Sequence, residues 1–298
     1  SDLSPMVRNC TFFSNWSNVY GGGMYNENSS PTVINGSFLE NRSVNYGGGV
    51  ANILSSPTMI NGSFSNNQAN NGGGLSSENS SNPTLTNCSF SGNQADNFGG
   101  GVFTTTNSHT SLSNCVLWGN SSEVSSLNGG AYTYSYTLIK GQNTVHFQGT
   151  EDPLFVNAAN GNLRLQACSP IINAGDNTAN STSSDLDGNT RIFNNGTIDL
   201  GAYEYQAAPP VAITPMVSIT QPTQCTYNGS IALSGFLAST TYSVSYKKNN
   251  TVVDAASHTS DAAGVITLSG LSSGNYTEIV ATYGTCVSTP VEATLNDP

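Results

Sequence analysis

Two glutamates occupy equivalent positions in repeated segments and are the candidate catalytic carboxyls. Glu27 and Glu78 each lie four residues after the last glycine of a Gly-Gly-Gly run, so they share a register two repeats apart. If each repeat forms one coil of a parallel solenoid, a coil spacing of ~4.8 Å places the two carboxyls roughly 10 Å apart. An inverting glycosidase uses carboxyls about 6.5–9.5 Å apart. Both residues lie in Asn- and Ser-rich turns, so the simpler interpretation is a pair of solvated side chains.

Other residue types that enzymes use are sparse in this sequence. A polysaccharide lyase needs a strong base beside carboxylate-bound calcium to remove a proton next to a sugar carboxylate. Arg8 and Arg42 are the basic residues of the repeat region, and no acidic cluster shares their register. His109, His146 and His258 are isolated from one another, which is typical of surface residues. The sequence favours a non-catalytic protein and leaves a lyase or glycoside hydrolase as the alternative.

One short acidic run is a candidate calcium site. Asp185, Asp187 and Asn189 form an Asp-x-Asp-Gly-Asn sequence, whose side-chain oxygens are of the kind that Ca²⁺ prefers. The spacing is not that of an EF-hand, because no Glu follows at the twelfth position. The alternative is a tight Asx turn with Gly188 at its apex and its carboxylates paired with Arg191. No other cofactor is expected.

An aromatic column precedes the glycine runs and is the candidate ligand-binding surface. The residue before each run is Tyr20, Tyr46, Asn71 or Phe98. If the rings point outward, Tyr20, Tyr46 and Phe98 form a surface for a polysaccharide or cell-surface glycan. The alternative is that the column packs inside the fold, as aromatic ladders in solenoids ordinarily do. Aromatic residues that would extend an outward surface are Trp16, Tyr25 and Phe103.

A repeat of about 26 residues places these candidates. Self-similarity at a fixed period is the signature of a repeat architecture. One copy contains Asn87-Cys88-Ser89-Phe90 and Gly99-Gly100-Gly101, and its first Asn recurs at steps of 26, 26, 26 and 27 residues. The recurring asparagines are Asn9, Asn35, Asn61, Asn87 and Asn114, and the glycine runs are residues 21–23, 47–49, 72–74 and 99–101.

The stacked copies form columns that predict the interior of a parallel β-helix. Apolar residues alternate with a period of two around each Asn, as in β-strands. The Asn column is expected to adopt the left-handed backbone region and to hydrogen-bond from coil to coil. The columns are Val33, Met59, Leu85 and Leu112; Phe12, Phe38, Phe64, Phe90 and Leu117; Met24, Val50, Leu75 and Val102; and the small residues Cys10, Gly36, Gly62, Cys88 and Cys115.

The Asn-Cys-Ser-Phe and triple-glycine motifs resemble the right-handed parallel β-helix repeats of polymorphic outer membrane proteins. This resemblance covers roughly residues 1–130. Segments 152–156, 169–175, 185–189 and 199–205 are similar to the closing segment of bacterial choice-of-anchor β-helix proteins. Together the resemblances imply a right-handed parallel β-helix over residues 1–205, in which a different coil type follows the repeats and the last motifs form a C-terminal cap. They also imply a bacterial protein that is secreted or displayed at the cell surface.

A second domain is predicted after a short linker. Residues 206–215 contain small residues and two prolines, which indicate the linker. Residues 216–298 show short alternating strands separated by polar turns, with a hairpin tip at residues 247–250. Tyr276 follows Leu271-Ser272-Ser273-Gly274-Asn275 in a segment similar to the corner of fibronectin-type modules, where the Tyr hydroxyl bonds to the backbone. We expect an immunoglobulin- or fibronectin-like β-sandwich, similar to modules of type IX-secreted surface proteins.

The six cysteines indicate one disulfide and leave a second pairing open. Cys225 and Cys286 lie near the first and last strands of the second domain, and a disulfide between them suits an exported protein. Cys88 and Cys115 share a register in adjacent coils, where the backbones are close enough for a disulfide. The favoured interpretation of that pair is two free thiols in the core.

Composition restricts the partners. The 298 residues include 7 Lys and Arg against 18 Asp and Glu, a formal charge of −11, so nucleic acid and anionic lipid surfaces would be repelled. No run of eighteen apolar residues is present, so membrane insertion is not expected. The sequence therefore favours an adhesin-like structural or binding protein, with other domains of a larger surface protein as partners. A subunit of an extracellular assembly is a further alternative, since the first repeat begins without a polar cap.

Overall fold

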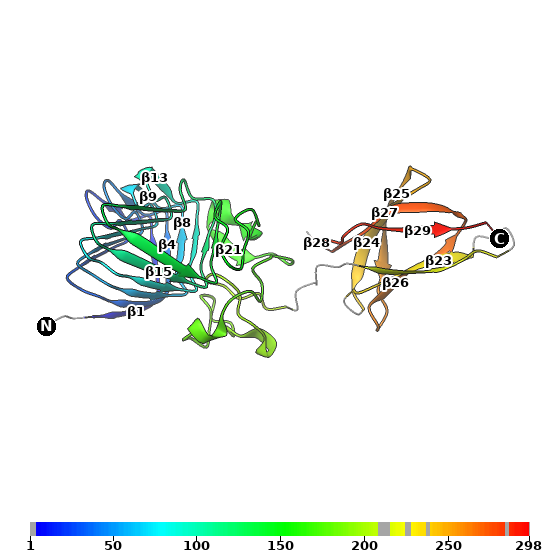
Figure 1. Cartoon of the computed structure of the whole chain (residues 1–298). Helices are drawn as coiled ribbons and strands as arrows, with labels where there is room; N and C mark the ends of the chain where they lie inside the picture. Colours follow the sequence, from blue (N-terminus) through cyan, green and yellow to red (C-terminus); the bar gives the residue numbers. More distant parts are fainter. Residues whose placement is uncertain (1–3, 208–214, 224–227, 237–238, 284–285, 298) are drawn as a thin grey trace. The chain divides into compact units, whose positions relative to one another are not determined.

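The chain forms two compact units composed almost entirely of β-strands. The computed structural model describes residues 4–207, 215–223, 228–236, 239–283 and 286–297. The units are Ser1–Ala207 and Ala208–Pro298 (Figure 1). Besides strands, these described residues hold three short 3₁₀ turns, and none of their helices is long and apolar enough to cross a membrane. Most of the predicted linker, residues 208–214, lies outside the described residues.

The first unit is a parallel β-solenoid of about 5 turns, which confirms the predicted all-β repeat fold. In one coil, β10 (Leu75–Glu78), β11 (Thr84–Thr86), β12 (Ser89–Ser91) and β13 (Gln94–Phe98) follow one another around the axis. Each strand pairs in parallel with its counterpart in the next coil, so three sheets run along the solenoid.

The three sheets are named here by number. Sheet 1 contains β3 (Met24–Glu27), β6 (Val50–Ile53), β10, β14 (Val102–Thr105) and β17 (Val124–Leu127). Sheet 2 contains β2 (Trp16–Ser17), β5 (Arg42–Ser43), β9 (Gln68–Asn71) and β13. Sheet 3 contains β1 (Met6–Phe13), β4 (Thr32–Leu39), β7 (Thr58–Ile60), β8 (Ser63–Ser65), β11, β12, β15 (His109–Ser113), β16 (Val116–Leu117), β18 (Ala131–Ser135) and β19 (Leu138–Ile139).

The recurring asparagines form the predicted ladder at the bend of sheet 3. Asn61 and Asn87 have φ values of 53° and 54°, in the left-handed region that Asn tolerates better than most residues. The Asn87 Nδ2 donates to Asn61 Oδ1 at 3.2 Å, and the Asn61 Nδ2 donates to Asn35 Oδ1 at 2.9 Å. We call this set the outer Asn ladder; its members are Asn9, Asn35, Asn61, Asn87 and Asn114.

A second asparagine ladder, not predicted from the sequence, runs inside the coils between sheets 3 and 2. Asn67 is fully buried, and its Oδ1 accepts from both the backbone N and the Nδ2 of Asn41 at 3.0 Å. Its own Nδ2 donates to Asn93 Oδ1 at 2.8 Å and to the carbonyl of Phe38 at 2.9 Å. These amides therefore satisfy backbone groups that the turn leaves unpaired. We call this set the inner Asn ladder; its members are Asn15, Asn41, Asn67, Asn93 and Asn120.

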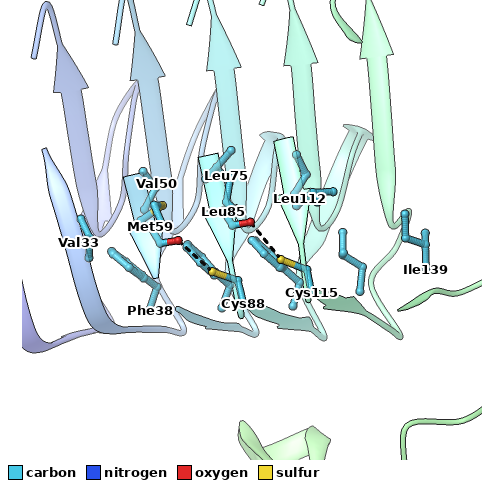
Figure 2. Packing of buried hydrophobic residues seen from close by; sticks show 14 residues of the cluster. Val33, Phe38, Val50, Met59, Leu75, Leu85, Cys88, Leu112, Cys115 and Ile139 are labelled. Atoms are coloured by element: carbon cyan, nitrogen blue, oxygen red, sulfur yellow. Dashed lines mark hydrogen bonds between the residues drawn. The ribbon is translucent and has the colours of Figure 1, made fainter. Parts of the chain in front are cut away.

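Apolar columns fill the space between the sheets as predicted (Figure 2). Phe38, Phe64 and Phe90 stack with ring centroids 4.8 and 4.3 Å apart and planes within 8° of parallel. Cys88 and Cys115 are buried free thiols, and burial raises the pKa of Cys88 well above its usual value. The favoured interpretation of this cysteine pair is therefore confirmed.

The triple glycines are required by close backbone contacts between coils. Gly73 donates its N–H to Gly99 O at 3.1 Å, and a Cβ on Gly73 would lie 2.4 Å from Gln94 O. Gly72 has a φ of +66°, which is strained for most residues with a side chain. The recurrence of the glycine run therefore reflects the close approach of successive coils.

The segment after the repeats does not add coils of a different type, contrary to the expectation from the resemblance. β20 (Phe155–Asn157) and β21 (Asn162–Leu165) pair antiparallel, and residues 158–205, here called the cover, lie against the outer side of sheet 3. Asn61 Nδ2 donates to Ser184 O at 2.8 Å, and Ser89 Oγ accepts from Ala202 N at 2.9 Å. The position of this segment is therefore set by side-chain and backbone contacts with the coil surface, and not by strand pairing with the preceding coil.

The second unit contains two antiparallel sheets around one core. One sheet is formed by β22 (Met216–Thr220), β23 (Gly229–Ser234) and β26 (Val265–Leu271), and the other by β24 (Thr241–Lys248), β25 (Thr251–Thr259), β27 (Gly274–Tyr283), β28 (Cys286–Val287) and β29 (Val291–Leu295). The Tyr276 hydroxyl donates to Ser272 O at 2.7 Å, as the corner motif predicts. Cys286 is disulfide-bonded, whereas Cys225 lies outside the described residues, so their pairing stays a prediction.

Candidate functional site

The outer side of sheet 1 gathers the aromatic residues singled out in the sequence. Leu75 and its counterparts point into the core, so the next residue of each strand points outward. Tyr25 is in register with Ala51, Ser76 and Phe103 at this outward position. Two large rings at the ends of this line therefore flank two small side chains, which leaves room for rings from the neighbouring turns.

The residues before the glycine runs supply those rings. Tyr20 stacks on Tyr25 with centroids 5.3 Å apart and on Tyr46 at 5.6 Å. The ring centroid of Phe103 lies 6.5 Å from that of Tyr46 and 6.0 Å from that of Phe98. These five residues form a continuous line that we call the aromatic row. Tyr25 and Phe98 at its ends are 41% and 43% exposed, Tyr20 and Tyr46 are partly exposed, and Phe103 is buried at 3%. Four of the five rings therefore reach solvent, and the row is separate from the interior phenylalanine stack.

Trp16 is not part of this row. It lies on β2 in sheet 2 and is 60% exposed. The structure thus brings Tyr20, Tyr46 and Phe98 together with Tyr25 and the buried Phe103, and places Trp16 elsewhere.

The two candidate carboxyls share the next outward register of sheet 1 but differ in environment. Glu27 pairs in register with Ile53, and Ile53 with Glu78. Glu27 is exposed, whereas Glu78 is 8% exposed. The difference follows from position, because β3 lies at one edge of sheet 1 while β10 has a strand on each side.

One oxygen of the Glu78 carboxyl is buried without compensation from the described residues. Within the described part of the chain, its Oε1 has no hydrogen-bond partner. Burial raises its pKa to about 7. Burial is the main cause that raises the pKa values of Tyr25 and Tyr46, and the charge of Glu78 adds to it, after Glu27 and Tyr20 in the case of Tyr25. The carboxyl therefore lies within electrostatic range of these two tyrosines of the aromatic row.

The site is acidic and aromatic. The five strands of sheet 1 contain Glu27 and Glu78 but no Lys, Arg or His. A carboxyl with a raised pKa can donate a proton, but Ile53 separates the two glutamates by two strand spacings, about 10 Å. The geometry suits binding through rings, hydroxyls and a carboxyl better than a paired-carboxyl hydrolysis.

No match to a known protein family was found. Comparison with family models gives no match for this chain, and comparison with curated proteins gives none either. The functional argument for the solenoid therefore rests on the geometry of sheet 1.

The predicted calcium ligands do not converge. Asp185 is buried, and its two oxygens accept from the backbone N of Asn189 at 2.8 Å and of Glu204 at 2.9 Å. Asp187 faces the other way and forms an ion pair with Arg164, with Nε to Oδ2 at 2.6 Å. The run is an Asx-type turn, but the arginine partner proposed for it was wrong, since Arg164 and not Arg191 binds Asp187.

Arg191 instead forms a buried charge cluster inside the cover. Its side chain is fully buried, and its Nη2 donates to the carbonyls of Asp199 at 2.9 Å and Gly201 at 2.6 Å. Its Nε lies 3.9 Å from Glu204 Oε2. Burial raises the pKa of Glu204 to about 8 and that of Asp199 to about 6. Sequence alone did not predict this cluster, because nothing in the pattern indicates that Arg191 is buried.

The burial of Glu78 predicts how the stability of the solenoid depends on pH. Its folded-state pKa of about 7 exceeds its ordinary value of 4.5, so the folded state holds a proton more tightly than the unfolded chain does. The contribution of this group is complete below pH 4.5 and is lost as the pH rises through 7. We expect Glu78→Gln to be about 1–3 kcal/mol more stable than the unsubstituted protein at pH 8.5, and similar to it near pH 5.

Urea titrations of both proteins at the two pH values check this expectation. Trp16 and Trp118 are the two tryptophans of the chain, so their fluorescence reports on the solenoid unit alone. Glu40→Gln is the matched control, because Glu40 is exposed and lies outside sheet 1. Identical midpoints for Glu78→Gln and the unsubstituted protein at pH 8.5 would contradict the argument.

Proposed function

We propose that the protein is a non-catalytic, adhesin-like protein of the bacterial surface or extracellular medium that binds glycans through the aromatic row. In this proposal the solenoid is a right-handed β-helix that serves as a rigid display surface. The second unit is an immunoglobulin-like sandwich that serves as a spacer to other domains. The observation that carries the proposal is the line of five rings on the outer side of sheet 1, of which Tyr20, Tyr25, Tyr46 and Phe98 reach solvent.

The row offers the contacts that sugars use. The rings overlap one another along the row, so their edges and hydroxyls, together with the faces of the two end rings, are available to a ligand. A ligand that follows the solenoid axis can contact several coils at once, because the rings come from the first, second and fourth repeats. Rigid positioning lowers the entropy cost of binding.

Two further observations support export and the absence of catalysis. Disulfides persist mainly in oxidising compartments, and Cys286 is disulfide-bonded. The histidines of the solenoid unit have local roles, since His109 Nε2 lies 3.0 Å from Thr133 Oγ1 and His146 stacks on Tyr136. Neither contacts the aromatic row.

Removal of one ring tests the proposal. We expect Tyr46→Ala to weaken binding of a neutral oligosaccharide at least tenfold, about 1.4 kcal/mol, because Tyr46 joins the two halves of the row. Binding is measured by calorimetry after a screen of immobilised glycans. Tyr134→Ala is the control, since Tyr134 is similarly exposed at 38% but lies on sheet 3.

The same preparation tests the second candidate, a hydrolase that uses Glu78 as an acid because of its raised pKa. A panel of polysaccharides, with and without Ca²⁺, should release no reducing or unsaturated ends. Turnover that disappears in Glu78→Gln would contradict the binding-only proposal.

A further inference from the structure

The buried Glu78 carboxyl on the outer side of sheet 1 has no cation beside it in the strands of that sheet. Glu78 is more than nine-tenths buried, and within the described residues its Oε1 has no hydrogen-bond donor. Buried polar groups in folded proteins are nearly always paired, and a lone carboxylate is among the most costly to leave unpaired. No residue of the five strands of sheet 1 can supply a cation. A cation from outside the chain would therefore offset the charge of this carboxylate.

The groups around Glu78 suit an ammonium group. Tyr25 and Tyr46 lie within electrostatic reach of the Glu78 carboxylate, and Tyr20 stacks on both rings. Aromatic faces and edges beside a carboxylate attract organic cations through cation–π and Coulomb interactions. Glu27, which bonds the Tyr25 side chain, adds a second negative charge in the same outward register. A uronic acid would meet like charges on this surface.

We infer that the aromatic row binds a glycan with cationic substituents, of the amino-sugar class, and that its ammonium group pairs with Glu78. This inference rests on the proposed glycan-binding function and specifies the charge of the ligand. A glycan is favoured over a basic peptide because the row is an extended line of rings from three coils, with a single buried carboxyl at one point.

The probes are two chito-oligosaccharides of equal length, one N-acetylated and neutral, the other N-trimethylated. The trimethylated amine keeps its charge at every pH, so any pH dependence of the preference comes from the protein. The protonatable groups near the site are Glu78, Glu27 and the hydroxyls of Tyr20, Tyr25 and Tyr46. We expect the cationic oligomer to bind at least tenfold more tightly than the neutral one at pH 8.5. The preference should shrink several-fold at pH 5.5, as Glu78 becomes protonated.

Three variants separate this inference from the function on which it rests. Glu78→Gln should abolish the preference, so that the affinities of the cationic and neutral oligomers come within twofold of each other. Glu40→Gln, which removes the same charge outside sheet 1, should keep the preference. Tyr46→Ala should weaken both oligomers.

Other results would contradict either the cationic inference alone or the proposed glycan binding as well. Equal binding of the two oligomers to the unsubstituted protein overturns the cationic inference and leaves glycan binding intact. Binding of neither oligomer, nor of any glycan in the screen, overturns both. A lysine-rich peptide that binds through Glu78 more tightly than the cationic oligomer overturns the assignment to glycans.

Discussion

Replacement of Asn67 by leucine is expected to destabilise the solenoid by about 3–8 kcal/mol, enough to unfold it under mild conditions. The leucine removes the acceptor for the backbone N and Nδ2 of Asn41 and the donor to the carbonyl of Phe38. All of these groups lie in the coil interior, where each unpaired polar group costs about 1–3 kcal/mol. Because Asn67 lies in the middle of the inner Asn ladder, the change affects the coils on both sides of it.

The measurement is the urea midpoint of tryptophan fluorescence, which reports on the solenoid unit. Asn97→Leu is the matched control, because Asn97 is exposed on β13. We expect the control to remain within about 0.5 kcal/mol of the unsubstituted protein. A similar midpoint for the two variants would show that the inner Asn ladder contributes little.

Arg191→Met is expected to cost about 3–5 kcal/mol at pH 8.5 and distinctly less at pH 5.5. The substitution leaves the carbonyls of Asp199 and Gly201 without their donor and the Glu204 carboxylate without its nearest cation. The pKa of Glu204 is about 8 and that of Asp199 about 6, so at pH 8.5 both are largely ionised. At pH 5.5 Glu204 is protonated and Asp199 substantially so, and the charge that the arginine compensates is smaller.

Arg164→Met provides the control with the same side-chain change. Arg164 pairs with Asp187 at the surface, with side chains 48% and 28% exposed, and such pairs contribute about 1 kcal/mol or less. The urea midpoints of both variants at pH 5.5 and 8.5 decide the matter. Equal losses at the two pH values for Arg191→Met would mean that the ionisation of Glu204 and Asp199 does not contribute.

The repeat region was predictable because its contacts are local to neighbouring coils. A fixed period places Asn61 beside Asn87 and Phe64 beside Phe90 once coils are assumed, and the structure has both contacts. The inner Asn ladder carried the same signal, since Asn67 and Asn93 are also 26 residues apart. A period alone does not reveal which asparagines point into the coil, so this ladder was not predicted.

The cover was not predictable in the same way. Its residues have no period, and their positions depend on contacts with coils far away in the sequence, such as Ala202 with Ser89, which are 113 residues apart. The burial of Arg191 likewise depends on this docking. The contrast between Glu27 and Glu78 also escaped sequence reasoning, because a shared register does not reveal that one strand lies at the edge of the sheet.

The cover also restricts how the number of repeats can change. Successive rungs of the outer Asn ladder each bond a different part of it: Asn61 contacts Ser184, Asn87 contacts Asn180, and Asn114 contacts Asp176. A repeat gained or lost between these rungs would shift their partners by one coil spacing, ~4.8 Å, and break the match. Solenoids usually lengthen and shorten in evolution by whole repeats. In this protein the contacts with the cover therefore constrain the number of coils beneath it.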